Sequence, residues 1–191
     1  EARFARDCLR QRPTIEVQIY KVKGSVFRHF KPHYYLDLPY PVAAEYFVGI
    51  VGNEPVCFLA VAPLFTAHAY RAIRLVVMPE WQGAGIGTRF LDAIGQYHLD
   101  GLGRCGHEFP TFFHTSHPQL CAALRRSKKW VQTGAMLYGA NKANSAKHIL
   151  SSREKTGKVF HDRNRITKGC CTGYGGHFRA VQSFKYLENN Q

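Results

Sequence analysis

Short runs in which apolar and polar residues alternate recur along the chain, and this alternation predicts β-strands. The pattern is clearest over residues 15–21, IEVQIYK, where branched apolar side chains occupy every second position. Gly52-Asn53 separates two apolar runs and is typical of a hairpin turn. Strands are expected at residues 15–21, 44–51, 55–65, 69–78, 111–115, 130–138 and 178–186.

Two segments have the helical spacing of apolar residues instead. In residues 85–102 apolar side chains recur every three or four positions, and residues 118–129 begin with a proline, which suits a first helical turn. Residues 28–41 are expected to form a loop or a short helix, and residues 141–176 a long basic connection. This order of elements predicts one α/β domain over residues 1–191, with a mixed sheet flanked by helices on both faces.

The charge of the chain points to a polyanionic partner. Its 191 residues include 26 Lys and Arg against 13 Asp and Glu, a formal net charge of +13. Basic residues are concentrated in amino-terminal and carboxyl-terminal extensions of the domain, with aromatic residues between them, a combination typical of nucleic-acid binding. A basic surface that serves solubility, with the aromatic residues in the core, is the alternative. The expected phosphate contacts after the second helix are Arg125, Arg126, Lys128 and Lys129.

The cysteines and histidines predict no metal site. The six Cys form no C-x-x-C pair, which favours a reducing, cytoplasmic compartment without structural disulfides. His114 and His117 have metal-like spacing, as do His107 and Glu108, but neither pair has a clear second pair of ligands. No stretch has the length and apolar character of a membrane span. The chain begins without Met or a signal-type segment, and we interpret this start as a trimmed or processed end.

The most informative stretch is RLVVMPEWQGAGIG, residues 74–87. A predicted strand ends at Met78, a glycine-rich turn follows, and a helix is expected to begin near Gly85. Small residues leave the backbone N–H groups of such a turn uncovered, and these groups and the positive end of the helix dipole suit phosphate oxygens. The spacing differs from the dinucleotide-binding fingerprint, and the lysine of a P-loop is missing. A purely structural turn is the alternative.

The same stretch resembles the acyl-CoA signature of the GNAT (GCN5-related N-acetyltransferase) superfamily, with Gln82, Gly85 and Gly87 at its key positions. The resemblance extends to the order of elements over about residues 15–138 and the last strand. It implies a GNAT-type mixed, splayed β-sheet and acetyl-CoA or another acyl-CoA as donor. It also implies that the backbone of Val76 and Met78 binds the pantetheine arm, and that a splay beside the strand at 111–115 admits the thioester. The donor-binding residues implied are Val76, Val77, Met78, Gln82, Gly83, Ala84, Gly85, Ile86, Gly87 and Thr88.

Two departures from the family pattern leave the general acid and base open. Family members often have a Glu on the strand before the glycine turn, where this chain has Arg71 and Arg74, and a Tyr in the helix after the fifth strand, where residues 118–129 have none. The sequence FHTSHP at the end of the splayed strand offers other groups, although Ser116 or Thr115 also suits a helix cap. The catalytic candidates are Ser116, His114, His117, Tyr138 and Glu45, with Asp37 as a further carboxylate.

The acceptor is predicted from the basic residues near the donor site. Arg71 and Arg74 suit a neutral amine on a nucleobase bound next to phosphates. Residues 70–138 also loosely resemble the Mom-like DNA-modification proteins of phages, which implies an adenine-modifying enzyme in the cytoplasm of a bacterial host. DNA is then the favoured partner, and the oligomeric state stays open, a dimer included. The alternatives are an acetyltransferase acting on protein, RNA or a small amine, and a nucleic-acid-binding protein that kept the fold and lost catalysis.

Overall fold

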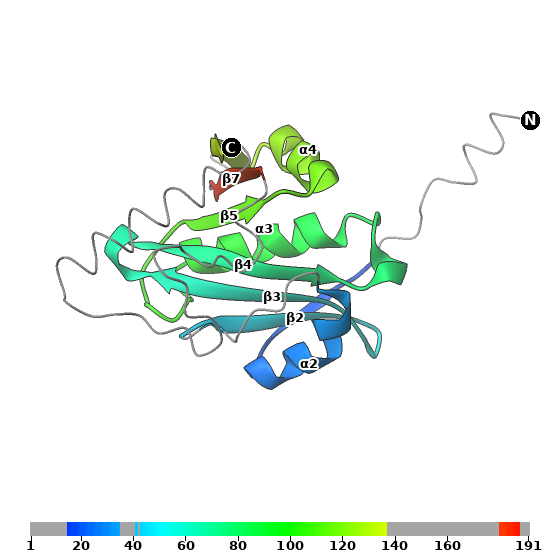
Figure 1. Ribbon diagram of the computed structural model, residues 1–191. Coiled ribbons are helices and arrows are strands. Elements are labelled where there is room, and N and C mark those ends of the chain that lie inside the picture. Colours follow the sequence, from blue (N-terminus) through cyan, green and yellow to red (C-terminus); the bar gives the residue numbers. More distant parts are fainter. Residues whose placement is uncertain (1–14, 35–40, 42, 137–179, 188–191) are drawn as a thin grey trace, which may run out of the picture.

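The computed structural model describes residues 15–34, 41, 43–136 and 180–187. Seven strands form one sheet in the order β1-β2-β3-β4-β5-β7-β6 (Figure 1). β4 and β5 run parallel, and the other neighbouring strands are antiparallel, so the expected mixed sheet is confirmed. The strands are β1 (Gln18–Val22), β2 (Glu45–Val51), β3 (Glu54–Leu64), β4 (Ala69–Val77), β5 (Thr111–Thr115), β6 (Trp130–Met136) and β7 (Val181–Tyr186).

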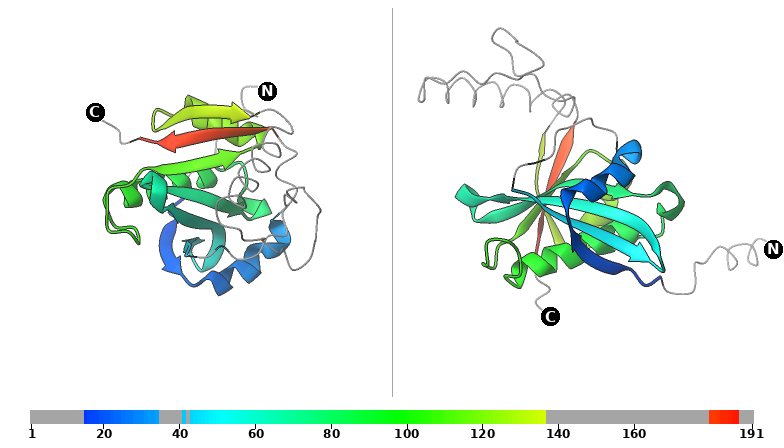
Figure 2. Two further views of the ribbon diagram at one scale, coloured as in Figure 1. Left: turned by 60° about the vertical axis from the view of Figure 1, so that its left-hand side comes forward. Right: turned by 90° about the horizontal axis from the view of Figure 1, so that it is seen from below.

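Helices cover both faces of this sheet, as the order of elements predicts (Figure 2). α3 (Ile86–Leu99) and α4 (Pro118–Arg126) pack on one face, which we call the α3 face. α2 (Phe27–Phe30) packs on the opposite face, called the α2 face. Four single-turn 3-10 helices complete the described elements: η1 (Gly24–Val26), η2 (Lys31–His33), η3 (Phe65–Ala67) and η4 (Pro79–Trp81).

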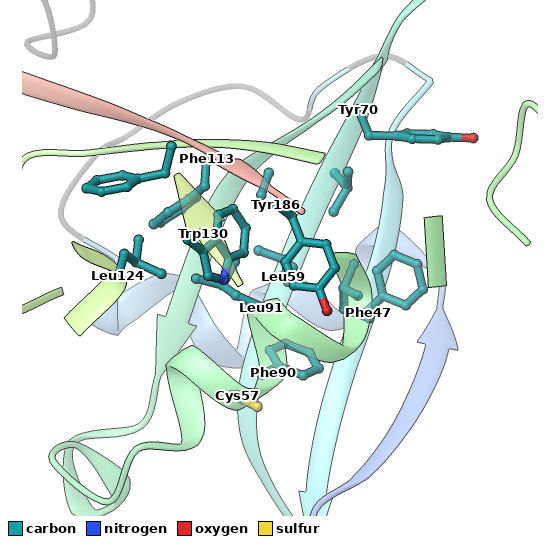
Figure 3. Close-up of a cluster of buried hydrophobic side chains, with 14 of the residues drawn as sticks. Phe47, Cys57, Leu59, Tyr70, Phe90, Leu91, Phe113, Leu124, Trp130 and Tyr186 are labelled. Atoms are coloured by element: carbon teal, nitrogen blue, oxygen red, sulfur yellow. The ribbon is translucent and has the colours of Figure 1, made fainter. Parts of the chain in front are cut away.

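The larger core lies between the sheet and α3 (Figure 3). The helical period brings Phe90, Leu91 and Ile94 to the sheet-facing side of α3, where each is at most 2% exposed. They belong to one cluster with aromatic side chains of the last strands, including Trp130 and Tyr186. Burial of each such side chain stabilises the fold by roughly 1.5–3 kcal/mol. This packing holds the amino-terminal end of α3 against β4. The site described below lies where these two elements meet.

Element boundaries differ from the predictions where turn residues interrupt the pattern. The first strand begins at Gln18 rather than at residue 15. The long helix ends at Leu99, because Gly101 adopts a left-handed conformation with φ of 72°. The hairpin turn is confirmed, with Gly52 at φ of 60°. The predicted basic connection at residues 141–176 lies outside the described residues.

Candidate functional site

The parallel strands β4 and β5 separate toward their carboxyl ends. They pair only at their beginnings, where Tyr70 to Ala72 lie opposite Thr111 to Phe113. In the described part of the chain, β4 then continues to Val77 without a pairing partner on its β5 side, while β5 pairs with β7 on its other edge. The expected splay is therefore present. It leaves part of one edge of β4 open in the middle of the sheet, where a bound chain could pair with it.

A β-bulge marks the point at which the two strands part. Ala60 pairs with Arg74 and Val61 with Ala72, so Ile73 is an extra residue with no partner on β3. Bulges bend a strand and change the direction of its backbone groups. The Tyr34 hydroxyl donates to the Ile73 carbonyl over 3.4 Å and thereby fixes the bulge from the α2 face. Bulge and splay coincide because β4 turns away from β5 at this residue.

The backbone direction of β4 corrects part of the predicted donor site. The Met78 N–H donates to the Val56 carbonyl at 2.9 Å, so this group is already used by β3. Because successive residues of a strand direct their N–H and C=O groups to opposite sides, Val76 also faces β3, whereas Leu75 and Val77 face the splay. The predicted backbone contacts of Val76 and Met78 with a donor are therefore wrong by one residue. The Val77 carbonyl accepts from Gln82 Nε2 at 3.0 Å, which ties the following turn to this edge.

The turn between β4 and α3 forms an open cradle of backbone N–H groups. Gly83 and Gly85 adopt left-handed conformations with φ of 84° and 78°, and a Cβ atom at either position would meet nothing within 4 Å. Gly85 is the N-cap of α3 and has no side chain to accept from the helix. The first helical N–H groups, those of residues 86–88, have no intrahelical acceptor and add to the positive end of the helix dipole. Uncovered N–H groups in this arrangement suit an anionic group.

The side chains of the cradle hold it in place. Ile86 is buried in the core, and Ala84 packs against the same cluster. A Cβ at Gly87 would lie 3.2 Å from Val77 Cγ2, so glycine here permits close packing of α3 on β4. The Thr88 hydroxyl donates to the Gly85 carbonyl at 2.9 Å. The surface offered to a ligand at these positions is thus mainly backbone.

His114 lies at the splay as an uncharged base. It is on β5 opposite Ser183 of β7, and its side chain is on the α2 face, since its neighbour Phe113 is in the α3-face core. Partial loss of water around the ring, and then the positive charge of Arg71, lower the pKa of His114 to about 4. The ring keeps an exposed surface. At neutral pH the ring is uncharged, and its free nitrogen can accept a hydrogen bond from a ligand at the splay.

Ser116 and His117 follow directly after β5, and the structure separates their roles. His117 is the N-cap of α4: its Nδ1 accepts from the Leu120 N–H over 3.4 Å. The cap predicted at Ser116 or Thr115 is thus wrong, because the chain bends one residue later. Thr115 instead accepts from the His117 N–H through its hydroxyl at 3.1 Å. Ser116 is half-buried next to the open end of β5.

Glu45 belongs to a buried network rather than to the splay. Lys21 Nζ donates to Glu45 Oε1 at 2.5 Å, the Arg104 N–H donates to Oε2 at 3.0 Å, and His98 Nε2 lies 3.5 Å from Oε2. Burial raises the pKa of Glu45, but the contacts with His98, Lys21 and Arg104 outweigh it and lower the pKa to about 2. Its partner His98 lies near the carboxyl end of α3, twelve residues, or about 18 Å, from the cradle. The prediction of a catalytic Glu45 is therefore wrong: it is a structural ion pair.

The same network contains residues that the sequence did not single out. His98 is completely buried, and its Nδ1 lies 2.9 Å from Thr111 Oγ1. The Tyr70 ring stacks on the imidazole with centroids 3.9 Å apart, and the Tyr70 hydroxyl accepts from the Cys105 N–H at 2.8 Å. These contacts join β4, β5 and α3 at the end of the sheet opposite to the cradle. They secure the beginnings of β4 and β5 together while the carboxyl ends separate.

The predicted phosphate contacts fall into different environments. Arg125, Arg126 and Lys128 are exposed at the end of α4, whereas Lys129 pairs with Asp92 over 3.7 Å. Arg74 is 4% exposed, and its guanidinium carbon lies 4.9 Å from the ring centre of Phe27 on the α2 face. The prediction that Arg74 contacts nucleic acid is therefore wrong, because its charge is enclosed by aromatic rings.

Arg71 is half-buried on the α2 face, one residue before the splay opens. Two further candidates, Tyr138 and Asp37, lie outside the described residues. In the part of the chain that the structure describes, no group of three His, Cys, Asp or Glu side chains has an arrangement that could hold a metal ion. Within those same ranges, no helix has the length and apolar character needed to cross a membrane.

Comparison with known proteins shows the fold. No family model matches the chain, and no curated protein matches it in sequence. Among solved structures, the ribosomal-protein-S18-alanine N-acetyltransferase from Escherichia coli matches with a TM-score of 0.52 and 10% identity, over 92% of this chain and 99% of that chain. A mutant form of the spermidine N-acetyltransferase SpeG from Vibrio cholerae matches with a TM-score of 0.57 and 11% identity, over 90% of this chain and 93% of that chain. The seven-stranded mixed sheet and its helices therefore have the fold of the GNAT N-acetyltransferases.

Proposed function

We propose that this protein is an N-acyltransferase that uses acetyl-CoA or another acyl-CoA as donor and an amine as acceptor. The main support for this proposal is that the open edge of β4 at the splay leads directly into the cradle before α3. An open edge of β4 leads from the bulge at Ile73 to an exposed set of N–H groups before α3. An extended, amide-containing chain that ends in a diphosphate fits these two features together.

The residues that would hold the donor follow from the geometry. The N–H groups of the turn and first helical residues, 83–88, would bind the diphosphate. The backbone of Leu75 and Val77, which faces the splay, would pair with the amides of the pantetheine arm. The open space around Gly83 and Gly85 supports this assignment, because a side chain at either position would enter the cradle.

His114 is the group best suited to assist the acceptor. An acyl-CoA supplies a thioester carbonyl that an amine nitrogen can attack, and the nitrogen must lose a proton as its new bond forms. His114 is uncharged at neutral pH and lies on the strand that borders the splay, so it can take that proton as a weak base. Ser116, at the open end of the same strand, is a candidate donor to the departing sulfur.

An amine on a protein or a small molecule is the better-supported acceptor. The structural neighbours named above are described as enzymes for an alanine of a ribosomal protein and for spermidine. A nucleic-acid acceptor is the second candidate. It rests on the net charge of +13 and on the exposed basic side chains at the end of α4, Arg125, Arg126 and Lys128.

Release of free CoA thiol tests this function. The protein would be incubated with acetyl-CoA and, separately, with spermidine, a peptide with an amino-terminal alanine, a lysine peptide and duplex DNA. We expect free CoA thiol to be released only when one of these amines is present, together with an equal amount of the acetylated amine. Failure to bind acetyl-CoA at all would contradict it. The variant His114→Gln should retain acetyl-CoA binding and lose most of the turnover.

A further inference from the structure

We propose that Arg71 forms an anion-binding subsite beside the splay, and that the acceptor amine is carried by a molecule with a carboxylate or phosphate group close to that amine. The inference rests on the proposed function, because it assigns the substrate class of the same site. It separates anionic amines from polyamines, both of which the fold alone would allow.

The position of Arg71 places its charge where an acceptor would approach. Arg71 pairs with Ala62 of β3 and with Phe112 of β5, one residue before the last paired position of the two parallel strands. Its side chain is on the α2 face, since its neighbours Tyr70 and Ala72 are in the α3-face core. His114, the proposed base, is on the same face, and the positive charge of Arg71 contributes to lowering its pKa.

The guanidinium group of Arg71 lacks a counter-ion among the described residues. Its Nε is buried and has no hydrogen-bond partner there, and no carboxylate in those ranges lies within 4.0 Å of the group. Lys185, which pairs with Phe112, adds a second basic side chain to this face. Among the described residues, the charge of Arg71 therefore has no compensating carboxylate.

A bound anion would compensate the charge of Arg71. Burial removes water from the guanidinium group and lowers the pKa of Arg71. A bound carboxylate or phosphate restores the lost interactions, because its oxygens match the planar donors of arginine. A second cation at this place, such as a polyamine, is repelled instead. The surroundings of Arg71 therefore favour an anion next to the reacting amine.

Histidine NMR tests the subsite without any turnover. The probes are inorganic phosphate and acetate, added separately to the wild type, to Arg71→Gln and to Arg28→Gln, in which an exposed arginine on the α2 side is changed in the same way. An anion bound at Arg71 should raise the pKa of His114 in the wild type and in Arg28→Gln, and leave it unchanged in Arg71→Gln. A His114 that does not respond in the wild type, or responds equally in Arg71→Gln, would overturn the proposal. The anion that raises the pKa of His114 at the lower concentration, phosphate or acetate, shows which class of anion the subsite prefers.

Matched acceptors then test the substrate class. O-phosphoethanolamine is compared with ethanolamine, and glycine with glycinamide, by release of CoA from acetyl-CoA. The wild type should prefer the anionic member of at least one pair by about tenfold or more, the effect of one charge-assisted contact, and Arg71→Gln should lose that preference. Equal or better use of ethanolamine and glycinamide, which lack the anionic group, refutes an anionic acceptor. If acetyl-CoA does not bind, the proposed function fails, while the histidine titration still decides the anion subsite.

Discussion

A substitution at Gly85 can distinguish an effect on ligand binding from an effect on folding. It holds φ of 78°, and a Cβ there would meet nothing within 4 Å. Alanine at this position is thus strained but makes no clash, and the left-handed conformation should cost roughly 1–2 kcal/mol. Gly106 is a matched control, since its φ is 65° and its Cβ would also meet nothing within 4 Å. Gly85→Ala and Gly106→Ala should each lower Tm by about 2–8 °C.

Only Gly85→Ala should weaken the binding of CoA. Its methyl group would occupy the surface of the cradle, whereas Gly106 lies beyond the other end of α3. Loss of one hydrogen bond to a charged group, roughly 1.5–3 kcal/mol, corresponds to about tenfold to a hundredfold in Kd. Titration calorimetry with CoA gives Kd, and thermal denaturation gives the stability of the same samples. The cradle is refuted if Gly85→Ala binds CoA as tightly as the wild type, or if Gly106→Ala loses as much affinity.

Three further predictions concern other parts of the molecule. The pKa of Glu45 is lowered from 4.5 to about 2, so the ionised carboxylate stabilises the folded protein by about 3 kcal/mol above pH 4.5. This stability should be lost as the pH falls toward 2, and urea denaturation should show the loss in the wild type and not in Glu45→Gln. Because the pKa of His114 is about 4, protonation of this ring should reduce kcat only near pH 4. If the wild type instead loses activity below about pH 6.5, and this loss is absent in His114→Gln, the lowered pKa is contradicted. If the basic end of α4 binds DNA, neutralising Arg125, Arg126 and Lys128 should reduce the salt dependence of log Kd by about 3; an unchanged slope excludes this surface.

The strands and helices were largely predictable because their signals are local. Alternation of apolar and polar residues predicts the first and the last strand, and the glycine turn alone places the beginning of α3. Apolar residues at helical spacing in α3 became the sheet-facing core, which made the layer order predictable as well. Each of these inferences depends on residues only a few positions apart.

The errors concern contacts between residues far apart in the sequence. Glu45 resembled a free carboxylate because its partners Lys21 and Arg104 lie 24 and 59 positions away. Arg74 resembled a surface cation because nothing local shows that Phe27 covers it. The backbone contacts at Val76 and Met78 were wrong by one residue, because the side of β4 that β3 uses is set by pairing between strands. The bulge at Ile73 has the same origin and no signal of its own.

We propose that the open edge of β4 and the glycine turn before α3 bind an acyl-CoA together. Backbone amide NMR during a titration with CoA measures this most directly. The largest shifts should occur at Leu75 and Val77 and at residues 83–88, with little change around His98 at the other end of α3. Saturating CoA that leaves those amides unshifted, or that shifts mainly the surroundings of His98, would contradict it.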